Sequence, residues 1–264
     1  MDTAQMTVAQ ITALLSQQDI SLHIITKLKQ DARLSVQRIA ERWEARRQKE
    51  QKEQERISAL YNYERGMQNQ GYSLVAGIDE AGRGPLAGPV VIGAVILPPD
   101  CYLPGLNDSK KLSAAQREKL YQEITAVAVA VNRCIVGVEI IDYLNIYHAT
   151  IAGMYKVIEG LVPAPQAVLI DAVPLPRLAV PSESIVSGDQ LSASIAAASI
   201  IAKVERDQIM DELDCQYPMY GFKRHKGYGT QEHMNALQQY GLCKYHRRSF
   251  APVNAVSTTN NNAG

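Results

Sequence analysis

Short apolar runs of strand character, separated by stretches of helical periodicity, make up the chain from residue 71 onward. The strongest run is Val90–Leu97 (VVIGAVIL), which is rich in β-branched residues and bounded by Pro89 and Pro98, as expected for a buried strand. The other strand candidates are Ser73–Ile78, Val127–Val138, Ala167–Val173 and Ser184–Val186, and helical periodicity covers Leu112–Tyr121, Ile140–Leu161 and Ser192–Leu213. Strands that alternate with helices predict an α/β layer architecture.

The first 70 residues have a different character, because their apolar positions recur at helical spacing. Thr7 precedes a first apolar set that begins at Val8, and a second set follows from Ile20. Between Glu41 and Arg56, eleven of sixteen residues are charged, five acidic and six basic, which is typical of a solvated helix. We expect a helical accessory domain over residues 1–70, either a spacer or a nucleic-acid-binding module. The main domain is then expected over residues 71–250, with a polar, disordered tail over residues 251–264.

Composition excludes several classes of protein. Of 264 residues, 46% are hydrophobic and 20% charged, which is ordinary for a globular chain and excludes wholesale disorder. No apolar stretch approaches the ~20 residues that cross a membrane, and the start of the chain lacks the features of a signal peptide. The four cysteines are never spaced as C-x-x-C, which argues against a zinc site. We expect a cytoplasmic protein with reduced thiols and no membrane partner.

Four acidic residues follow the apolar strands: Asp79, Glu80, Asp171 and Asp189. Taken singly, each is explained as well by a helix cap or a turn. Together they predict a metal site, because converging carboxylates repel one another unless a cation neutralises them. Hard oxygen ligands suit Mg²⁺ or Mn²⁺, and a pair of such ions performs phosphodiester chemistry. Because adjacent strand residues point to opposite faces, Asp79 and Glu80 can share a site only if the strand ends there.

Two short segments are candidates for phosphate or sugar binding. The glycines of Gly82-Arg83-Gly84 let the backbone approach a ligand, and exposed N–H groups can hold phosphate or ribose oxygens. A tight turn is the alternative, and the segment matches no Walker or dinucleotide-binding motif. Lys110, in the turn at Asn107–Lys111, could contact a phosphate or belong to a surface loop.

The region Gly221–Arg248 combines basic and aromatic residues. Its basic members are Lys223, Arg224, Lys226, Lys244, Arg247 and Arg248, interleaved with Tyr228, Tyr245, His225, His233 and His246, and Tyr220 directly precedes it. Such a mixture suits phosphate contacts and stacking on sugars or bases, although a solvated basic surface explains the charges almost as well. The histidines lack a companion at ligand spacing, so we expect no transition-metal site. Ser199 and Lys203 could mimic a Ser/Lys nucleophile pair, but no G-x-S-x-G elbow exists and core packing is the preferred interpretation.

Five motifs in order closely resemble those of bacterial ribonuclease HII, a type 2 ribonuclease H family. They are GIDEAGRGPLAGPVV (Gly77–Val91), NDSKKL (Asn107–Leu112), VLIDAV (Val168–Val173), SGDQLSASIAAASIIAKVERD (Ser187–Asp207) and HKGYGTQEH (His225–His233). The resemblance covers roughly residues 71–250. It implies a ribonuclease-H-like mixed five-stranded sheet flanked by helices, with a helical C-terminal extension. It also implies an endonuclease that cuts the RNA strand of RNA–DNA hybrids and nicks 5′ of ribonucleotides in duplex DNA, leaving 3′-hydroxyl and 5′-phosphate ends.

The resemblance also implies roles for individual residues. Asp79, Glu80, Asp171 and Asp189 match the family's catalytic metal ligands for Mg²⁺ or Mn²⁺. Gly82, Arg83 and Gly84 match the loop that reads the ribose 2′-hydroxyl, Tyr228 the tyrosine that packs on the sugar, and Lys110 a phosphate-contacting lysine. Ser187 stands where the family usually has a lysine, so that positive charge beside Asp189 is missing. Residues 1–70 look like an extension associated with substrate binding. We expect a monomer.

Three other functions are compatible with these residues. A junction resolvase on the same scaffold would ignore a single ribonucleotide, whereas the enzyme expected here cuts beside it. A protein that kept the groove without catalysis would bind hybrids and cut nothing. A phosphotransferase acting on small molecules is disfavoured by the lack of a nucleotide-binding loop.

Overall fold

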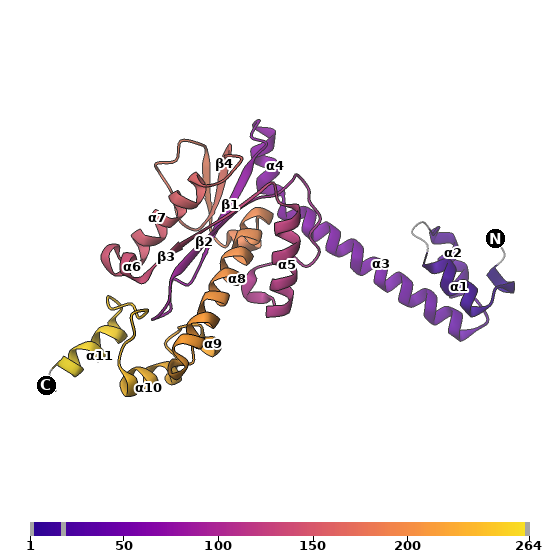
Figure 1. The fold of residues 1–264 in the computed structure, drawn as a ribbon. Coiled ribbons are helices and arrows are strands. Elements are labelled where there is room, and N and C mark those ends of the chain that lie inside the picture. The colour runs from indigo at the N-terminus through magenta and orange to yellow at the C-terminus, as the bar shows by residue number, and fades with distance from the viewer. Residues whose placement is uncertain (1–2, 17–19, 262–264) are drawn as a thin grey trace. The chain divides into compact units, whose positions relative to one another are not determined.

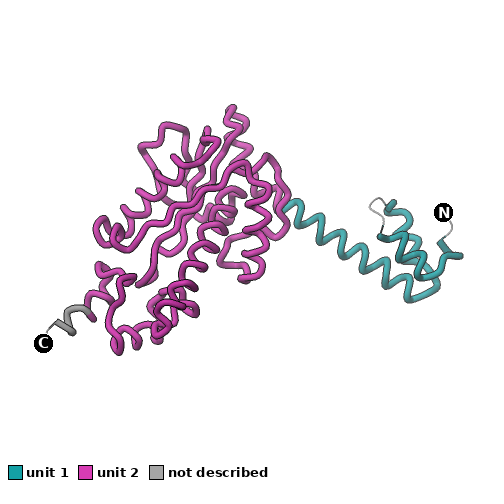
Figure 2. The backbone as a smooth tube through the Cα atoms, viewed as in Figure 1, with its two compact units in different colours: residues 1–56 teal, residues 57–264 magenta. Residues whose placement is uncertain are grey.

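A computed structural model of the protein describes residues 3–16 and 20–261 (Figure 1). The chain divides into two compact units, residues 1–56 and residues 57–264 (Figure 2). The division falls inside the long helix α3 (Leu34–Leu60), whereas the composition of the sequence changes near residue 71. The reason lies in packing: Ile57, Leu60 and Tyr61 are buried in a core of the second unit.

The first unit is helical, as the periodicity predicts. It contains the 3₁₀ turn η1 (Thr3–Gln5), α1 (Val8–Leu15), α2 (Leu22–Lys29) and most of α3. Thr7 begins α1 through a capping box with Gln10, in which each side chain accepts a hydrogen bond from the other residue's backbone N–H. The unit has its own small core, which includes Ile11, Leu28 and Trp43.

The second unit is built on a mixed five-stranded sheet, which confirms the expected architecture. The strands are β1 (Val75–Ala81), β2 (Val90–Ile96), β3 (Ala130–Val136), β4 (Ala167–Asp171) and β5 (Ser182–Ile185). Their order across the sheet is β3-β2-β1-β4-β5. β1, β2 and β3 pair antiparallel, while β1 with β4 and β4 with β5 pair parallel. The two parallel pairings direct the carboxyl ends of β1, β4 and β5 to one edge of the sheet.

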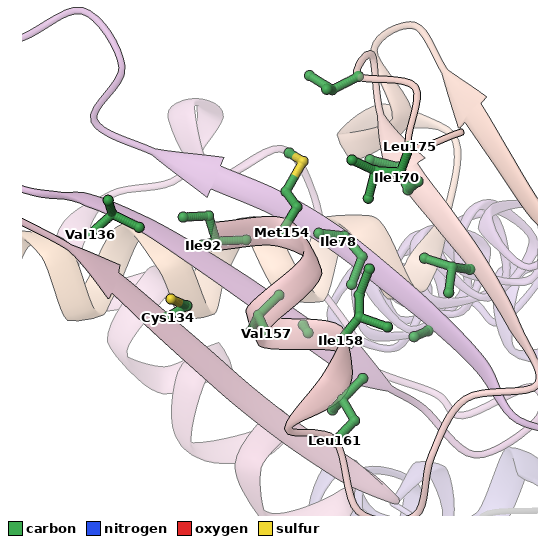
Figure 3. Packing of buried hydrophobic residues seen from close by; sticks show 14 of the residues in the cluster. Ile78, Ile92, Cys134, Val136, Met154, Val157, Ile158, Leu161, Ile170 and Leu175 are labelled. Atoms are coloured by element: carbon green, nitrogen blue, oxygen red, sulfur yellow. The ribbon is translucent and has the colours of Figure 1, made fainter. Parts of the chain in front are cut away.

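Helices cover both faces of this sheet (Figure 1). The helices of the second unit that follow α3 are α4 (Asn62–Asn69), α5 (Ala114–Val127), α6 (Val138–Leu144), α7 (Ile146–Glu159), α8 (Ala193–Gln216), α9 (Phe222–His225), α10 (Gln231–Tyr240) and α11 (Ala251–Asn261), with 3₁₀ turns η2 (Ser109–Lys111), η3 (Gly188–Gln190) and η4 (Pro218–Tyr220). On one face, Met154 and Val157 of α7 pack against Ile78 and Ile92 of the strands (Figure 3). On the other face, α8 and α5 enclose a second apolar cluster.

The close approach of α8 to the sheet depends on small residues, as the composition of this helix indicates. A methyl group added at Gly77 of β1 would lie 2.0 Å from the carbonyl carbon of Ser194, and one at Gly93 of β2 would lie 2.4 Å from the carbonyl oxygen of Ala198. At the start of α8, the buried Glu64 accepts hydrogen bonds from the Ser192 hydroxyl (2.6 Å) and the Ser194 N–H (2.8 Å). Helix α8 is therefore fixed against β1 and β2, beside the predicted site.

Several boundaries differ from the sequence prediction, and two of the differences are larger than a shift of a few residues at a strand end. Helix α5 continues to Val127, so β3 begins at Ala130 rather than at residue 127. The single long helix expected over Ile140–Leu161 is two helices, because Asn145 between them adopts a positive φ of 67°. The Asn145 side chain then accepts a hydrogen bond from the N–H of His148 and so caps α7.

The expectation of a disordered tail from residue 251 is wrong for most of that segment. Residues Ala251–Asn261 form helix α11, and Val253 is fully buried in a cluster with Phe222 and Leu237. Apolar contacts of this kind outweigh the polar composition. Residues 262–264 lie outside the described residues.

Over the part of the chain that is described, no helix is both long and apolar enough to cross a membrane.

Candidate active site

The parallel neighbours β1 and β4 bring three of the predicted acids to one edge of the sheet. Their pairing ends at Ile78 opposite Ile170, so Asp79 and Asp171 are the next residue of each strand. On its other side, β1 stays paired with β2 as far as Ala81. After residue 78, β1 is therefore no longer paired with β4 but is still paired with β2. This one-sided end of pairing is enough for Asp79 and Glu80 to share the site, so the expectation that the whole strand must end there was too strict.

Asp189 reaches the same place from the turn η3. The backbone N–H of Gly188 donates a 2.7 Å hydrogen bond to Oδ1 of Asp171, which ties this turn to the end of β4. A side chain at Gly188 would collide with Ile195, since an added methyl carbon would lie 2.6 Å from its Cδ1. The preceding Ser187 has a left-handed backbone, with φ of 58°. The structure thus brings together acids that lie far apart in the chain.

Burial and repulsion from neighbouring acids raise the pKa values of Asp79, Glu80 and Asp189. Asp79 is only 3% exposed, and burial, followed by the charges of Glu80 and Asp171, raises its pKa well above the ordinary value. Burial also raises the pKa of Glu80, against the opposing effect of Arg83. Burial raises the pKa of Asp189 as well, and Lys110 opposes the shift. Perturbed acids that face a cleft are a frequent sign of a functional site.

Each carboxylate has a partner in the protein. Oε1 of Glu80 lies 3.2 Å from the Arg83 guanidinium, and Oδ2 of Asp189 lies 3.2 Å from Nζ of Lys110. Oδ1 of Asp79 accepts the N–H of Glu80 at 2.7 Å. With these partners in place, no three His, Cys, Asp or Glu side chains of the described residues form a ready-made ligand set. Oε2 of Glu80, however, is buried with no hydrogen-bond partner among them. Such an unsatisfied oxygen, among four carboxylates, fits a divalent cation.

A cleft of about 510 Å³ opens beside the carboxylates. Eight of the nine predicted site residues line it: Asp79, Glu80, Gly82, Arg83, Gly84, Lys110, Asp171 and Tyr228. The ninth, Asp189, is buried and bonded to Lys110. Tyr228 is 48% exposed, and a methyl group added at Gly84 would lie 3.6 Å from its Cε1. The glycine turn and the tyrosine therefore border one part of the cleft.

Helix α8 contributes lining residues for which core packing was the preferred interpretation. Both Ser199 and Lys203 line the cleft, although Ser199 is only 3% exposed, as expected for a packed position. The Ser199 hydroxyl lies 2.9 Å from the Ser109 hydroxyl, and Lys203 forms a 2.6 Å ion pair with Asp207. The two do not act as a nucleophile pair, since Lys203 is bound elsewhere. In the sequence, their spacing of four residues on one helix indicates that both side chains lie on the same face of α8.

The basic C-terminal region is only partly a surface. Arg247 is 0% exposed, and its guanidinium donates to backbone carbonyls under the glycine turn. Lysine and arginine in a sequence indicate exposure, which is why this burial could not be predicted. The three histidines are buried and bonded: Nε2 of His233 lies 3.1 Å from Nε2 of His246, and His225 stacks on His233 at 4.6 Å. They connect the turn that carries Tyr228 to the C-terminal segment.

Carboxylates gathered at one edge of a mixed five-stranded sheet, beside a cleft with basic walls, are the arrangement of ribonuclease-H-like nucleases, a class of metal-dependent hydrolases. The Ribonuclease HII family model matches residues 76–253, and the model of the Ribonuclease HII N-terminal domain matches residues 7–68. The chain therefore belongs to the ribonuclease HII family. As a member it is an endoribonuclease for RNA–DNA hybrids and depends on divalent metal.

Individual relatives agree with this assignment. The Ribonuclease HII of Bacillus cereus (strain Q1) is 48% identical over 240 residues, which cover 91% of this chain and 92% of that protein. The ribonuclease H2 from Pyrococcus horikoshii OT3 is similar in structure, with a TM-score of 0.61 and 25% identity over 70% of this chain and 97% of that one. Bst-RNase HIII, solved in complex with Mn²⁺, shares the fold at a TM-score of 0.54 and 17% identity, over 74% of this chain and 72% of that one.

Proposed function

We propose that this enzyme nicks duplex DNA on the 5′ side of an embedded ribonucleotide, in addition to cutting the RNA strand of hybrids, and leaves 3′-hydroxyl and 5′-phosphate ends. The observation that carries the proposal is the position of the carboxylate cluster beside the turn Gly82-Arg83-Gly84, along one cleft. A hydrolytic centre next to a backbone able to sense one sugar can act on a single ribonucleotide. The 2′-hydroxyl is the group that distinguishes this substrate from DNA.

Asp79, Glu80, Asp171 and Asp189 are proposed to hold two divalent cations, Mg²⁺ or Mn²⁺. The ions would supply an activated water for in-line attack and stabilise the leaving 3′-oxygen. Support comes from the donor set, which consists of hard oxygen atoms, and from the partnerless buried Oε2 of Glu80. It also comes from the pKa of Asp79, which burial and two neighbouring acids raise, since a cation in their midst would relieve that repulsion.

The sugar-reading role is assigned to the turn and to Tyr228. The turn and Tyr228 line the same part of the cleft. In this position the Tyr228 ring can pack on a sugar, while backbone N–H groups of the turn can donate to the 2′-hydroxyl. None of these contacts involves a base edge. We therefore propose cleavage that is independent of base sequence.

Lys110 is proposed to contact a substrate phosphate, and its present contact indicates how. Its side chain is 74% exposed, yet its ammonium lies beside Asp189. A cation bound by Asp189 would compete with this ion pair, and the flexible stem of Lys110 would let the ammonium turn toward the backbone of the nucleic acid. The same lysine supplies a positive charge next to Asp189, so the charge expected to be missing because of Ser187 comes from another element.

The decisive experiment is to map the cut on a DNA duplex that contains one ribonucleotide. We expect a single nick 5′ of the ribonucleotide with either Mg²⁺ or Mn²⁺, a 3′-hydroxyl end, and no nick in the all-DNA duplex. The variant Asp79→Asn should bind the duplex and leave it intact. A nuclease that cuts long hybrids but ignores the single ribonucleotide would refute the proposal, and so would a nick on the 3′ side.

Residues 1–70 are proposed to contribute to nucleic-acid binding. Within the first unit, a groove of about 360 Å³ is lined by Arg42, Trp43 and Arg46, and the Arg47 guanidinium lies 5.1 Å from the centre of the Trp43 ring. Basic groups beside an aromatic ring suit a phosphate backbone. In the full chain, Arg42→Gln with Arg46→Gln should weaken hybrid binding and flatten its salt dependence by about one unit of slope per lost contact. Unchanged binding would favour a spacer.

The enzyme is proposed to act as a monomer. The support is that all nine candidate site residues come from one chain and converge without a second copy. Light scattering across the concentrations used in the cleavage assay should give the mass of a single chain, about 29.1 kDa. Activity that appears only with a heavier species would contradict this part of the proposal.

A further inference from the structure

Two arginines lie buried beneath the glycine turn, and one of them, Arg247, belongs to the region for which the sequence indicated a basic surface. Arg247 is 0% exposed and Arg206 is 1% exposed. Every hydrogen bond of their guanidinium groups within the described residues goes to a backbone carbonyl. A buried charge is costly unless hydrogen bonds satisfy it. A set of carbonyl acceptors as complete as this one therefore indicates a specific arrangement.

Arg247 holds the turn from inside. Its Nη2 donates to the carbonyl of Gly82 at 2.6 Å, and its Nη1 donates to the carbonyl of Arg83 at 2.8 Å. Nε and Nη2 also donate to the carbonyl of Gly88, at 2.9 and 2.8 Å. One planar guanidinium therefore joins both ends of the segment from Gly82 to Gly88.

Arg206 supports the same segment from α8. Its Nε donates to the carbonyl of Pro89 at 3.0 Å, and its Nη2 donates to the carbonyls of Ala87 and Lys226 at 3.2 and 3.0 Å. It also lies directly under Gly82, where an added methyl carbon would be 2.0 Å from Nε. Gly82 has a φ of +97°, a conformation that favours glycine. The turn cannot settle closer to α8.

The orientation of two peptide units follows from these contacts. In a trans peptide, the carbonyl of one residue and the N–H of the next point in opposite directions. Since Arg247 binds the carbonyls of Gly82 and Arg83, the N–H groups of Arg83 and Gly84 point away from it. Neither N–H has an acceptor among the described residues. The turn thus presents two adjacent free donors on the side away from the buried guanidinium.

We propose that Arg247 is a positioning residue for sugar recognition: by holding the carbonyls of Gly82 and Arg83, it orients the N–H groups of Arg83 and Gly84 toward the ribonucleotide. Arg206 fixes the base of the same turn. This inference rests on the proposed function and deepens it, because it assigns discrimination of the sugar to a residue that touches no substrate. Lysine cannot replace Arg247, since a single ammonium cannot span three carbonyls with the geometry of a planar fork.

The test is a thermodynamic cycle between Arg247 and the 2′-hydroxyl. Wild type and Arg247→Lys are titrated by fluorescence anisotropy, without divalent metal, against two DNA duplexes that differ only in one ribonucleotide or its deoxy counterpart. For the wild type we expect the deoxy duplex to bind about tenfold more weakly, as for the loss of one or two hydrogen bonds. For Arg247→Lys we expect the two duplexes to differ by less than about threefold. Arg248→Lys, an exposed neighbour, is the matched control and should keep the tenfold difference.

Thermal unfolding of each variant accompanies the titrations. A folded Arg247→Lys that retains the tenfold difference overturns the inference while the proposed function stands. A wild type that nicks at the ribonucleotide yet binds both duplexes equally overturns it too. A wild type that nicks neither duplex refutes the proposed function itself, so the two failures are distinguishable.

A second variant keeps the inference testable if Arg247→Lys does not fold. Gly84 has no positive φ, and an added methyl group would meet only the Tyr228 ring at 3.6 Å, so Gly84→Ala should melt like the wild type. Its methyl group would stand beside the outward N–H groups. We expect at least fivefold weaker binding of the ribonucleotide duplex, with unchanged binding of the deoxy duplex. Equal affinities in Gly84→Ala and wild type would show that this side of the turn does not meet the sugar.

Discussion

Replacing Asp79 by asparagine should destroy catalysis and yet stabilise the metal-free protein. Asp79 is nearly fully buried, and its pKa is raised by burial, then by the charges of Glu80 and Asp171. The change to asparagine keeps the shape of the side chain. The new amide oxygen can still accept the N–H of Glu80, and the amide nitrogen can donate to the Ser199 hydroxyl. The substitution removes only one negative charge, and that charge destabilises the folded state.

The magnitude follows from Coulomb's law. At an effective dielectric constant of ~20, two like charges ~5 Å apart repel by about 3 kcal/mol. Part of that repulsion is already relieved in the wild type, because the raised pKa of Asp79 favours its neutral form. We therefore expect a gain of about 1–2 kcal/mol in the free energy of unfolding. For a folded unit of this size, each kcal/mol shifts the melting temperature by ~2–4 °C, so the expected rise is about 2–8 °C.

Calorimetry in chelator, compared with calorimetry in excess Mg²⁺, measures the effect. Without metal, Asp79→Asn should melt above the wild type at pH 8. The advantage should shrink as the pH falls, since the folded-state pKa of Asp79 lies above the unfolded value and protonation removes the same charge. With Mg²⁺ the order should reverse, because only the wild type gains stability from binding. Cleavage of a hybrid should fall below detection in the variant.

A lower melting temperature for Asp79→Asn in chelator would refute the reasoning. It would show that the Asp79 carboxylate is stabilised by its surroundings more than it is repelled, so that the cluster is a structural network instead of a site built to bind a cation. The matched control is Asp142→Asn, at a carboxylate that accepts the N–H groups of Arg248 and Ser249 outside the cluster. That change should lower the melting temperature, because it weakens two charge-assisted hydrogen bonds.

Three further outcomes are expected. Gly93→Ala should lower the free energy of unfolding, measured in urea, by about 3 kcal/mol, since its methyl carbon would lie 2.4 Å from a backbone oxygen of α8; a loss under ~1 kcal/mol contradicts the tight packing. Burial lowers the pKa of His246 to about 4, so stability should be full above pH ~6.5 and fall by up to ~3 kcal/mol toward pH 4, with a flatter profile in His246→Gln. Glu64→Ala should cost about 2 kcal/mol in thermal unfolding by removing the acceptor at the start of α8, while a neutral result would deny it that role.

Much of the fold could be predicted because its strands are buried on both faces. Val90–Ile96 is fully buried between two helical layers, and its continuous apolar run in the sequence has that same origin. The break at Asn145 could not be predicted, since a positive φ at one asparagine leaves the helical periodicity on both sides intact. The helix at Ala251–Asn261 was missed for the related reason that a few buried contacts, such as those of Val253, decided its conformation.

The acids of the site were visible because charge at the end of an apolar strand is conspicuous. Asp79 and Asp171 stand at equivalent places on paired strands, and periodicity alone marks both. Arg206 and Arg247 carried no such signal. Their role depends on three-dimensional contacts with carbonyls, and the backbone atoms that receive their hydrogen bonds are the same in every residue type. A sequence shows where charges are, but it does not show which of them lies beneath a turn.

The charge beside Asp189 shows how one site can be completed from an unexpected element. Ser187 carries no positive charge. Its left-handed backbone conformation would strain a lysine at this position as it strains the serine. Lys110, held by the turn that Asp108 caps, places its ammonium 3.2 Å from Asp189 and 3.8 Å from Asp108. A lysine on a separate, exposed turn can leave when a cation arrives, whereas one adjacent in the chain would stay close to Asp189. At the proposed site, metal binding and phosphate binding would be coupled through Lys110, because an ion held by Asp189 would compete with the ammonium, which would then be free to contact a substrate phosphate.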